Sequence, residues 1–73
     1  MDIPVTFEFE GKQYHGAFSE VLGVGRDHWH LMVDKFYWGQ LRRVGDTWFF
    51  DENKQRVGHL VDYFADVIIA WYE

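Results

Sequence analysis

The chain has 73 residues, no cysteine and a formal net charge of −5. It is long enough for one small domain, and without cysteine it has neither a disulfide nor a thiolate metal ligand. The acidic balance argues against a nucleic-acid partner, and the short apolar runs argue against a membrane-spanning segment.

The first two predicted elements are strands, over residues 4–10 and 13–19. Apolar and polar side chains alternate in both, and a period of two is typical of strands with one buried face. A glycine between them can adopt the positive φ of a tight hairpin turn. A two-residue turn at Gly11-Lys12 predicts that Phe9 pairs with Tyr14 across the hairpin.

Three further strands are predicted after a glycine-rich loop, over residues 28–33, 37–44 and 47–51. They show the same alternation of apolar and polar side chains. A turn at Gly45-Asp46 joins the last two strands. This turn pairs Leu41 with Phe50 and Arg43 with Trp48 on the same face, and Leu41 and Phe50 are expected in the core.

The turn between the third and fourth strands decides which face of the sheet Trp38 occupies. A three-residue turn over 34–36 pairs Leu31 with Gly39, keeps Leu41 in the core and directs Trp38 outward. A two-residue turn at Asp34-Lys35 shifts this pairing and buries Trp38 instead. We favour the three-residue turn because it agrees with the turn at Gly45-Asp46 on the position of Leu41.

A helix is predicted over residues 57–72, because apolar residues recur there at helical spacing. The apolar stripe consists of Val57, Leu60, Val61, Phe64, Val67, Ile68 and Trp71. Capping groups are available just before it, in Asp51, Glu52 and Asn53. Gly58 disfavours the first turn by about 1 kcal/mol relative to Ala, so the helix is expected to start nearer His59.

Together these elements predict one α+β domain over residues 1–73. Short loops favour sequential antiparallel pairing, so the sheet is expected to be a five-stranded antiparallel meander, either open or curled into a small open barrel. The C-terminal amphipathic helix then packs on one face of the sheet.

The sheet face turned away from the helix is the predicted functional surface. In the favoured register it gathers Met32, Trp38 and Phe49, with a polar rim of His28, His30, Gln40 and Arg42. Aromatic residues, Met and Arg are enriched at protein interfaces. We therefore expect a non-enzymatic protein-interaction module whose partner is another protein or, in a homodimer, a second copy of this chain.

Two alternatives share this surface. Exposed aromatic rings beside Gln and Arg also suit a small ligand or a carbohydrate. Two histidines at alternate positions, His28 and His30, point to the same side of their strand and could share a metal ion. A third ligand would have to come from His15, Glu8 or Asp27. The plainer interpretation is that both imidazoles face solvent.

No catalytic residue and no cofactor are predicted. The only serine, Ser19, lacks the glycine pattern of a nucleophile elbow. A chain this small is also expected to have little room for a pocket of several hundred Å³. The absence of cysteine, and of a signal-peptide pattern at Met1–Pro4, makes a cytoplasmic location the expectation.

Overall fold

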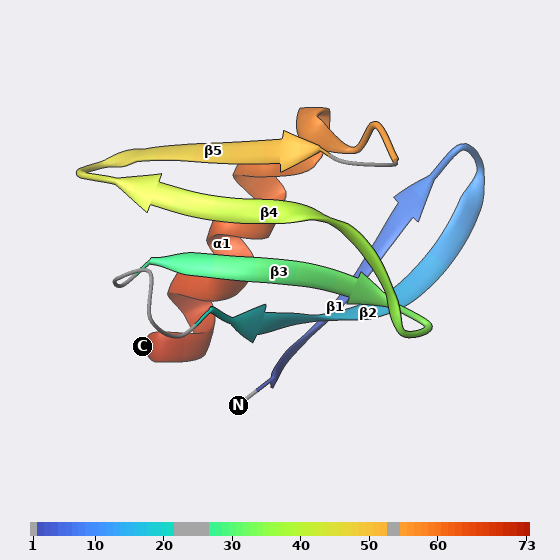
Figure 1. Ribbon diagram of the computed structural model, residues 1–73, viewed down its shortest axis with the longest axis horizontal. Coiled ribbons are helices and arrows are strands. Elements are labelled where there is room, and N and C mark those ends of the chain that lie inside the picture. The colour runs from blue at the N-terminus through green and yellow to red at the C-terminus, as the bar shows by residue number, and fades with distance from the viewer. Residues whose placement is uncertain (1, 22–26, 53–54) are drawn as a thin grey trace.

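The computed structural model of the protein describes residues 2–21, 27–52 and 55–73 (Figure 1). The elements follow the predicted order: β1 (Asp2–Phe9), β2 (Lys12–Glu20), β3 (His28–Val33), β4 (Phe36–Val44), β5 (Thr47–Glu52), the short 3₁₀ helix η1 (Gly58–Leu60) and α1 (Val61–Tyr72). The strands form one antiparallel sheet in sequential order, which confirms the predicted α+β meander. Within these residues, no helix is long and apolar enough to cross a membrane.

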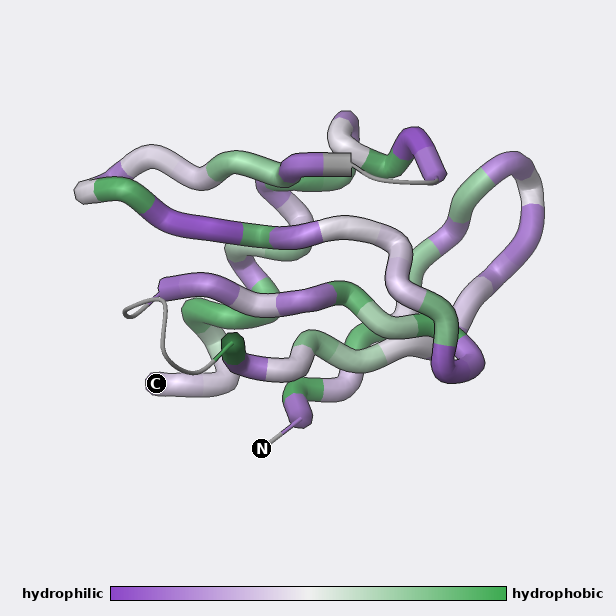
Figure 2. The backbone as a smooth tube through the Cα atoms, in the orientation of Figure 1, coloured by the Kyte–Doolittle hydropathy of each residue, from purple (hydrophilic) through white to green (hydrophobic). Residues whose placement is uncertain are grey.

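The sheet is curled into a half-barrel, and α1 crosses its concave side (Figure 1). Hydrophobic and hydrophilic residues alternate along the strands (Figure 2), so each strand contributes one row of side chains to the interior. The buried core is made of Ile3, Val5, Phe7, Phe18, Trp29, Leu31, Val33, Trp38, Leu41, Val57, Phe64, Ala65 and Ile68.

Phe64 is the central contact between α1 and the sheet. Its ring lies 5.5 Å from the ring of Phe7, 5.3 Å from that of Phe18 and 5.4 Å from that of Phe50. These rings come from β1, β2 and β5. One helical side chain therefore fills the concave side of a sheet that would otherwise expose it.

The β1–β2 hairpin has the predicted faces but not the predicted pairs. Its turn residues are Glu10 and Gly11, with φ of 51° and 74°, as a type I′ turn requires. The turn pairs Phe7 with Tyr14, so the predicted pairing of Phe9 with Tyr14 is wrong. The shift is by two residues, and each side chain therefore keeps its predicted face.

The β3–β4 connection is a two-residue turn at Asp34 and Lys35, with φ of 51° and 70°. The predicted three-residue turn is therefore wrong. The pairing of Leu31 with Gly39 is nevertheless present, because the register shifts between Leu31 and the next residue of β3. This β-bulge leaves Trp38 as the extra residue of β4.

Trp38 accordingly lies in the core, with 7 % of its surface exposed. Its ring is 5.6 Å from that of Phe7, 5.8 Å from that of Phe9 and 4.9 Å from that of Tyr14. The prediction that Trp38 faces outward is wrong, whereas the prediction that Leu41 is buried is correct. The bulge allows both residues to point inward although they are three positions apart.

The β4–β5 hairpin matches the prediction, with Leu41 opposite Phe50 and Arg43 opposite Trp48. The predicted helix divides into η1 and α1, so the α-helix itself starts later than expected. Asp51 and Glu52 belong to β5 and do not cap it, since Leu60 holds the N-cap position without a side-chain hydrogen bond. Asn53 lies outside the described residues.

Candidate functional site

The outer face of the sheet contains six of the seven residues predicted to form the functional surface. His28, His30 and Met32 occupy the outward positions of β3, Gln40 and Arg42 those of β4, and Phe49 lies on β5. Strand pairing brings His30 beside Gln40, His28 beside Arg42, and Arg42 beside Phe49. Trp38 is the exception, because the bulge directs it into the core.

Tyr37 takes the outward position that was predicted for Trp38. Its ring packs edge-on against the imidazole of His30, with centroids 4.9 Å apart. Burial, and secondarily the nearby carboxylate of Asp51, raise the pKa of Tyr37 above its usual value. Its hydroxyl therefore remains a neutral hydrogen-bond donor over an extended pH range.

On this outer face, Arg42 contacts both a carboxylate and an aromatic ring. Arg42 Nε donates to Asp51 Oδ2 at 2.7 Å, and the guanidinium of Arg42 lies 4.5 Å from the ring centroid of Phe49. Phe49 remains 40 % exposed. The outer face is thus a mixed polar and aromatic surface with Phe49 as an exposed apolar residue.

The predicted metal ligands do not converge. His15 pairs with Thr6, and their Nδ1 and Oγ1 atoms are 3.2 Å apart, while Glu8 lies opposite Gln13. Among the residues that the structure describes, no three His, Asp or Glu side chains are placed to hold a metal ion. Within the described part of the chain, the histidine pair of β3 therefore has no third ligand of the kind that a metal site requires.

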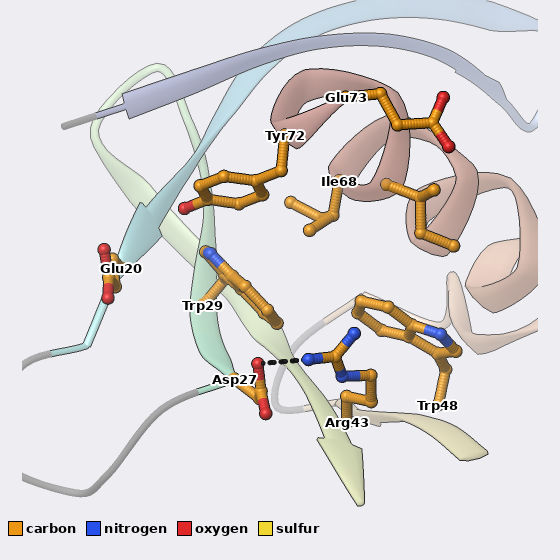
Figure 3. Close-up of a pocket in the computed structure, with 9 residues that line it drawn as sticks. Glu20, Asp27, Trp29, Arg43, Trp48, Ile68, Tyr72 and Glu73 are labelled. Atoms are coloured by element: carbon orange, nitrogen blue, oxygen red, sulfur yellow. Dashed lines mark hydrogen bonds and ion pairs between the residues drawn. The ribbon is translucent and has the colours of Figure 1, made fainter. Parts of the chain in front are cut away.

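A second site lies on the opposite side of the sheet, between the ends of β3, β4 and β5 and the C-terminal end of α1 (Figure 3). It is a pocket of about 420 Å³, within the range of small-molecule sites. We call it the indole pocket; its lining residues are Glu20, Asp27, Trp29, Arg43, Trp48, Ile68, Ile69, Tyr72 and Glu73. This volume is larger than the little room that so short a chain was expected to offer.

The sheet forms one wall of the indole pocket, and strand pairing brings the residues of this wall together. Arg43 and Trp48 are an opposed pair close to the β4–β5 turn, and Trp29 lies on the inward side of β3. The two indoles stack with centroids 5.6 Å apart and planes inclined by 26°. From the other side, Tyr72 of α1 completes the pocket while remaining 60 % exposed.

Two polar features mark the indole pocket. Arg43 Nη2 donates to Asp27 Oδ1 at 2.9 Å, and the guanidinium lies 5.5 Å from the ring centroid of Trp48. Trp29 is only 4 % exposed, and its buried Nε1 has no acceptor among the described residues. Figure 3 shows this nitrogen at the end of the indole that is nearer Tyr72.

Sequence reasoning missed the indole pocket, although one signal for it was present. The predicted register already set Arg43 opposite Trp48 on the core side, and a charged residue at an inward position is unusual. That position is inward but lies near the end of the sheet.

No protein-family model matches this chain, and no curated protein or solved structure is detectably similar to it.

Proposed function

We propose that this protein is a non-enzymatic binding module whose indole pocket takes a small, largely apolar ligand. The observation that carries the proposal is the buried indole N–H of Trp29, which has no acceptor among the described residues and belongs to a side chain that lines a pocket of about 420 Å³. Ligand pockets typically combine an apolar lining with a few polar groups that orient the ligand. The stacked indoles provide the first, and the Trp29 N–H provides the second.

The energetics of the Trp29 side chain support a ligand with a hydrogen-bond acceptor. A buried donor without an acceptor costs about 1–3 kcal/mol. An acceptor brought in by a ligand would recover part of that free energy. Ile69 and Tyr72 present exposed apolar surface at the same place, and covering it would add to the affinity.

The apolar lining is tested by titrating the ¹⁵N-labelled protein with indole, a small neutral aromatic probe that carries no hydrogen-bond acceptor. The four tryptophans give four indole N–H resonances. We expect those of Trp29 and Trp48 to move and to saturate, while that of Trp38, which does not line this pocket, stays in place. A titration that moves no resonance of the two pocket tryptophans contradicts the proposal.

A matched pair of variants locates the binding site. Tyr72→Ala removes an exposed ring that lines the indole pocket, whereas Trp71→Ala removes an exposed ring that does not. An aromatic contact contributes about 0.5–1.5 kcal/mol, so the affinity for indole should fall about twofold or more in Tyr72→Ala only. Equal losses in the two variants would place the site elsewhere.

Protein interaction through the outer face remains a second candidate, with a partner protein or a second copy of this chain. Its support is the ring of Phe49, which is 40 % exposed and lies next to the guanidinium of Arg42. If the chain self-associates there, Phe49→Ala should lower the sedimentation coefficient at high concentration. Wild-type protein that sediments as a monomer at that concentration rejects the homodimer.

A carbohydrate ligand and a cytoplasmic location also remain proposals. The carbohydrate proposal is tested by repeating the titration with a panel of glycans, and it fails if no tryptophan resonance moves. The location is tested by fractionating cells that express the chain.

A further inference from the structure

The charges around the indole pocket indicate the chemistry of its ligand, and this step rests on the proposed function above. Three carboxyl groups line the pocket, from Glu20, Asp27 and Glu73, against the single guanidinium of Arg43. Asp27 is already neutralised by Arg43. Among the described residues, no ion pair engages Glu20 or Glu73. The pocket therefore presents negative charge that a ligand could compensate.

The aromatic lining favours the same ligand charge. A cation within about 6 Å of a ring centroid is attracted by the ring, most strongly by that of Trp. The pocket already contains one such contact, because the guanidinium of Arg43 lies 5.5 Å from the centroid of Trp48. Tyr72 adds a third, largely exposed ring to the two stacked indoles. Carboxylates and rings together attract a positive group.

The Trp29 N–H adds a requirement that a simple cation does not meet. It is buried and has no acceptor among the described residues, so the ligand should also bring an oxygen acceptor. A primary ammonium is strongly hydrated and loses much of its hydration free energy on entering an apolar pocket. A methylated ammonium is covered by methyl groups, which can pack against Ile69 and the indoles.

From these contacts we infer that the ligand of the indole pocket is an organic cation of the methylated-ammonium class that carries a hydroxyl or carbonyl oxygen. Choline is the simplest probe of this class. Its neutral carbon isostere, 3,3-dimethylbutan-1-ol, has the same shape and the same hydroxyl group. The two probes therefore differ only in the charge that the pocket is inferred to recognise.

The experiment is a titration of the ¹⁵N-labelled chain with each probe, followed at the indole resonances of Trp29 and Trp48. Choline is expected to bind about tenfold more tightly than its neutral isostere, as a cation–π contact strengthened by carboxylates implies. Equal binding of the two probes, or tighter binding of the isostere, overturns the inference.

A charge-matched pair of variants tests the part played by the carboxylates. Glu20→Gln is expected to weaken choline binding about threefold or more and to leave binding of the isostere unchanged. Glu8→Gln removes the same charge from an exposed position outside the indole pocket, and it should leave choline binding unchanged. Equal effects of the two variants would show that only the net charge of the molecule matters, and would overturn the inference.

Tetramethylammonium tests the acceptor, because it keeps the charge and lacks the hydroxyl group. It should bind more weakly than choline and should leave the Trp29 resonance closest to its free position. If tetramethylammonium binds as tightly as choline, the ligand does not need an oxygen acceptor, and that part of the inference is wrong.

The outcomes separate this inference from the proposed function. If indole moves the Trp29 and Trp48 resonances and choline does not, the indole pocket binds ligands but not this class, and only the inference fails. If neither probe moves them, the proposed function fails with it.

Discussion

At the scale of the residue, the β4 bulge determines which side chains fit in the core at two neighbouring positions. Trp38 and Gly39 are both buried at the bulge, and the glycine leaves room for a ring of the next strand. A Cβ atom at Gly39 would lie 2.5 Å from Cζ of Phe50, closer than two carbon atoms can approach without displacement. A side chain is therefore accepted at Trp38 and not at the following position.

Trp38 and Phe49 were predicted to share one face of the sheet, and their alanine variants should differ in stability because only Trp38 is buried. Trp38→Ala removes a buried ring and should cost about 3–5 kcal/mol of unfolding free energy. Phe49→Ala removes an exposed ring held by Arg42 and should cost about 1 kcal/mol or less. Urea unfolding of both variants measures the difference, and similar losses would contradict the burial of Trp38.

At the scale of the element, turn chemistry settled the registers that alternation left open. Of the three hairpin turns that the structure describes in full, two have positive φ at both central residues, at Glu10-Gly11 and at Asp34-Lys35. Such turns match the right-handed twist of the strands, and they are adopted here although Lys35 is an unfavourable residue for positive φ. The twist of the paired strands thus outweighs the local preference of one residue.

The β3–β4 turn consequently stores strain that a glycine should relieve. A left-handed conformation costs a non-glycine residue about 1–2 kcal/mol, while glycine loses about 0.5–1 kcal/mol of entropy. Lys35→Gly should therefore raise the unfolding free energy by roughly 0.5–1 kcal/mol. Thermal and urea unfolding measure the change.

Lys35→Ala is the control for this turn, because it removes the charge but keeps the Cβ atom. It should not stabilise the protein. If alanine stabilises it as much as glycine, the charge of Lys35 and not its backbone conformation is responsible.

At the scale of the whole molecule, the half-barrel depends on α1 to fill its concave side. Phe64 contacts rings from β1, β2 and β5, and Val57 and Ile68 are buried near it. A domain of this size has about 4–11 kcal/mol of stability in total. The loss of one central contact is therefore large relative to the whole.

Phe64→Ala should accordingly cost about 3–5 kcal/mol and leave a substantial fraction of the chain unfolded at 37 °C. Circular dichroism and the dispersion of the amide resonances measure the unfolded fraction. Phe64→Leu, which keeps much of the volume, should lose less. A fully folded Phe64→Ala variant would show that the sheet does not need the helix.

The sequence alone determined the α+β meander, because alternation in the strands and the helical stripe are local patterns that burial on one face imposes. It also determined the β4–β5 pairing, where Gly45 defines the turn. Only the tertiary structure decided the position of Trp38 and the presence of the indole pocket. A bulge depends on whether the rings of Phe7, Tyr14 and Phe50 accept the displaced residues, and the pocket forms between the strand ends and the last turn of α1. Both depend on contacts between residues far apart in the chain, which no local pattern encodes.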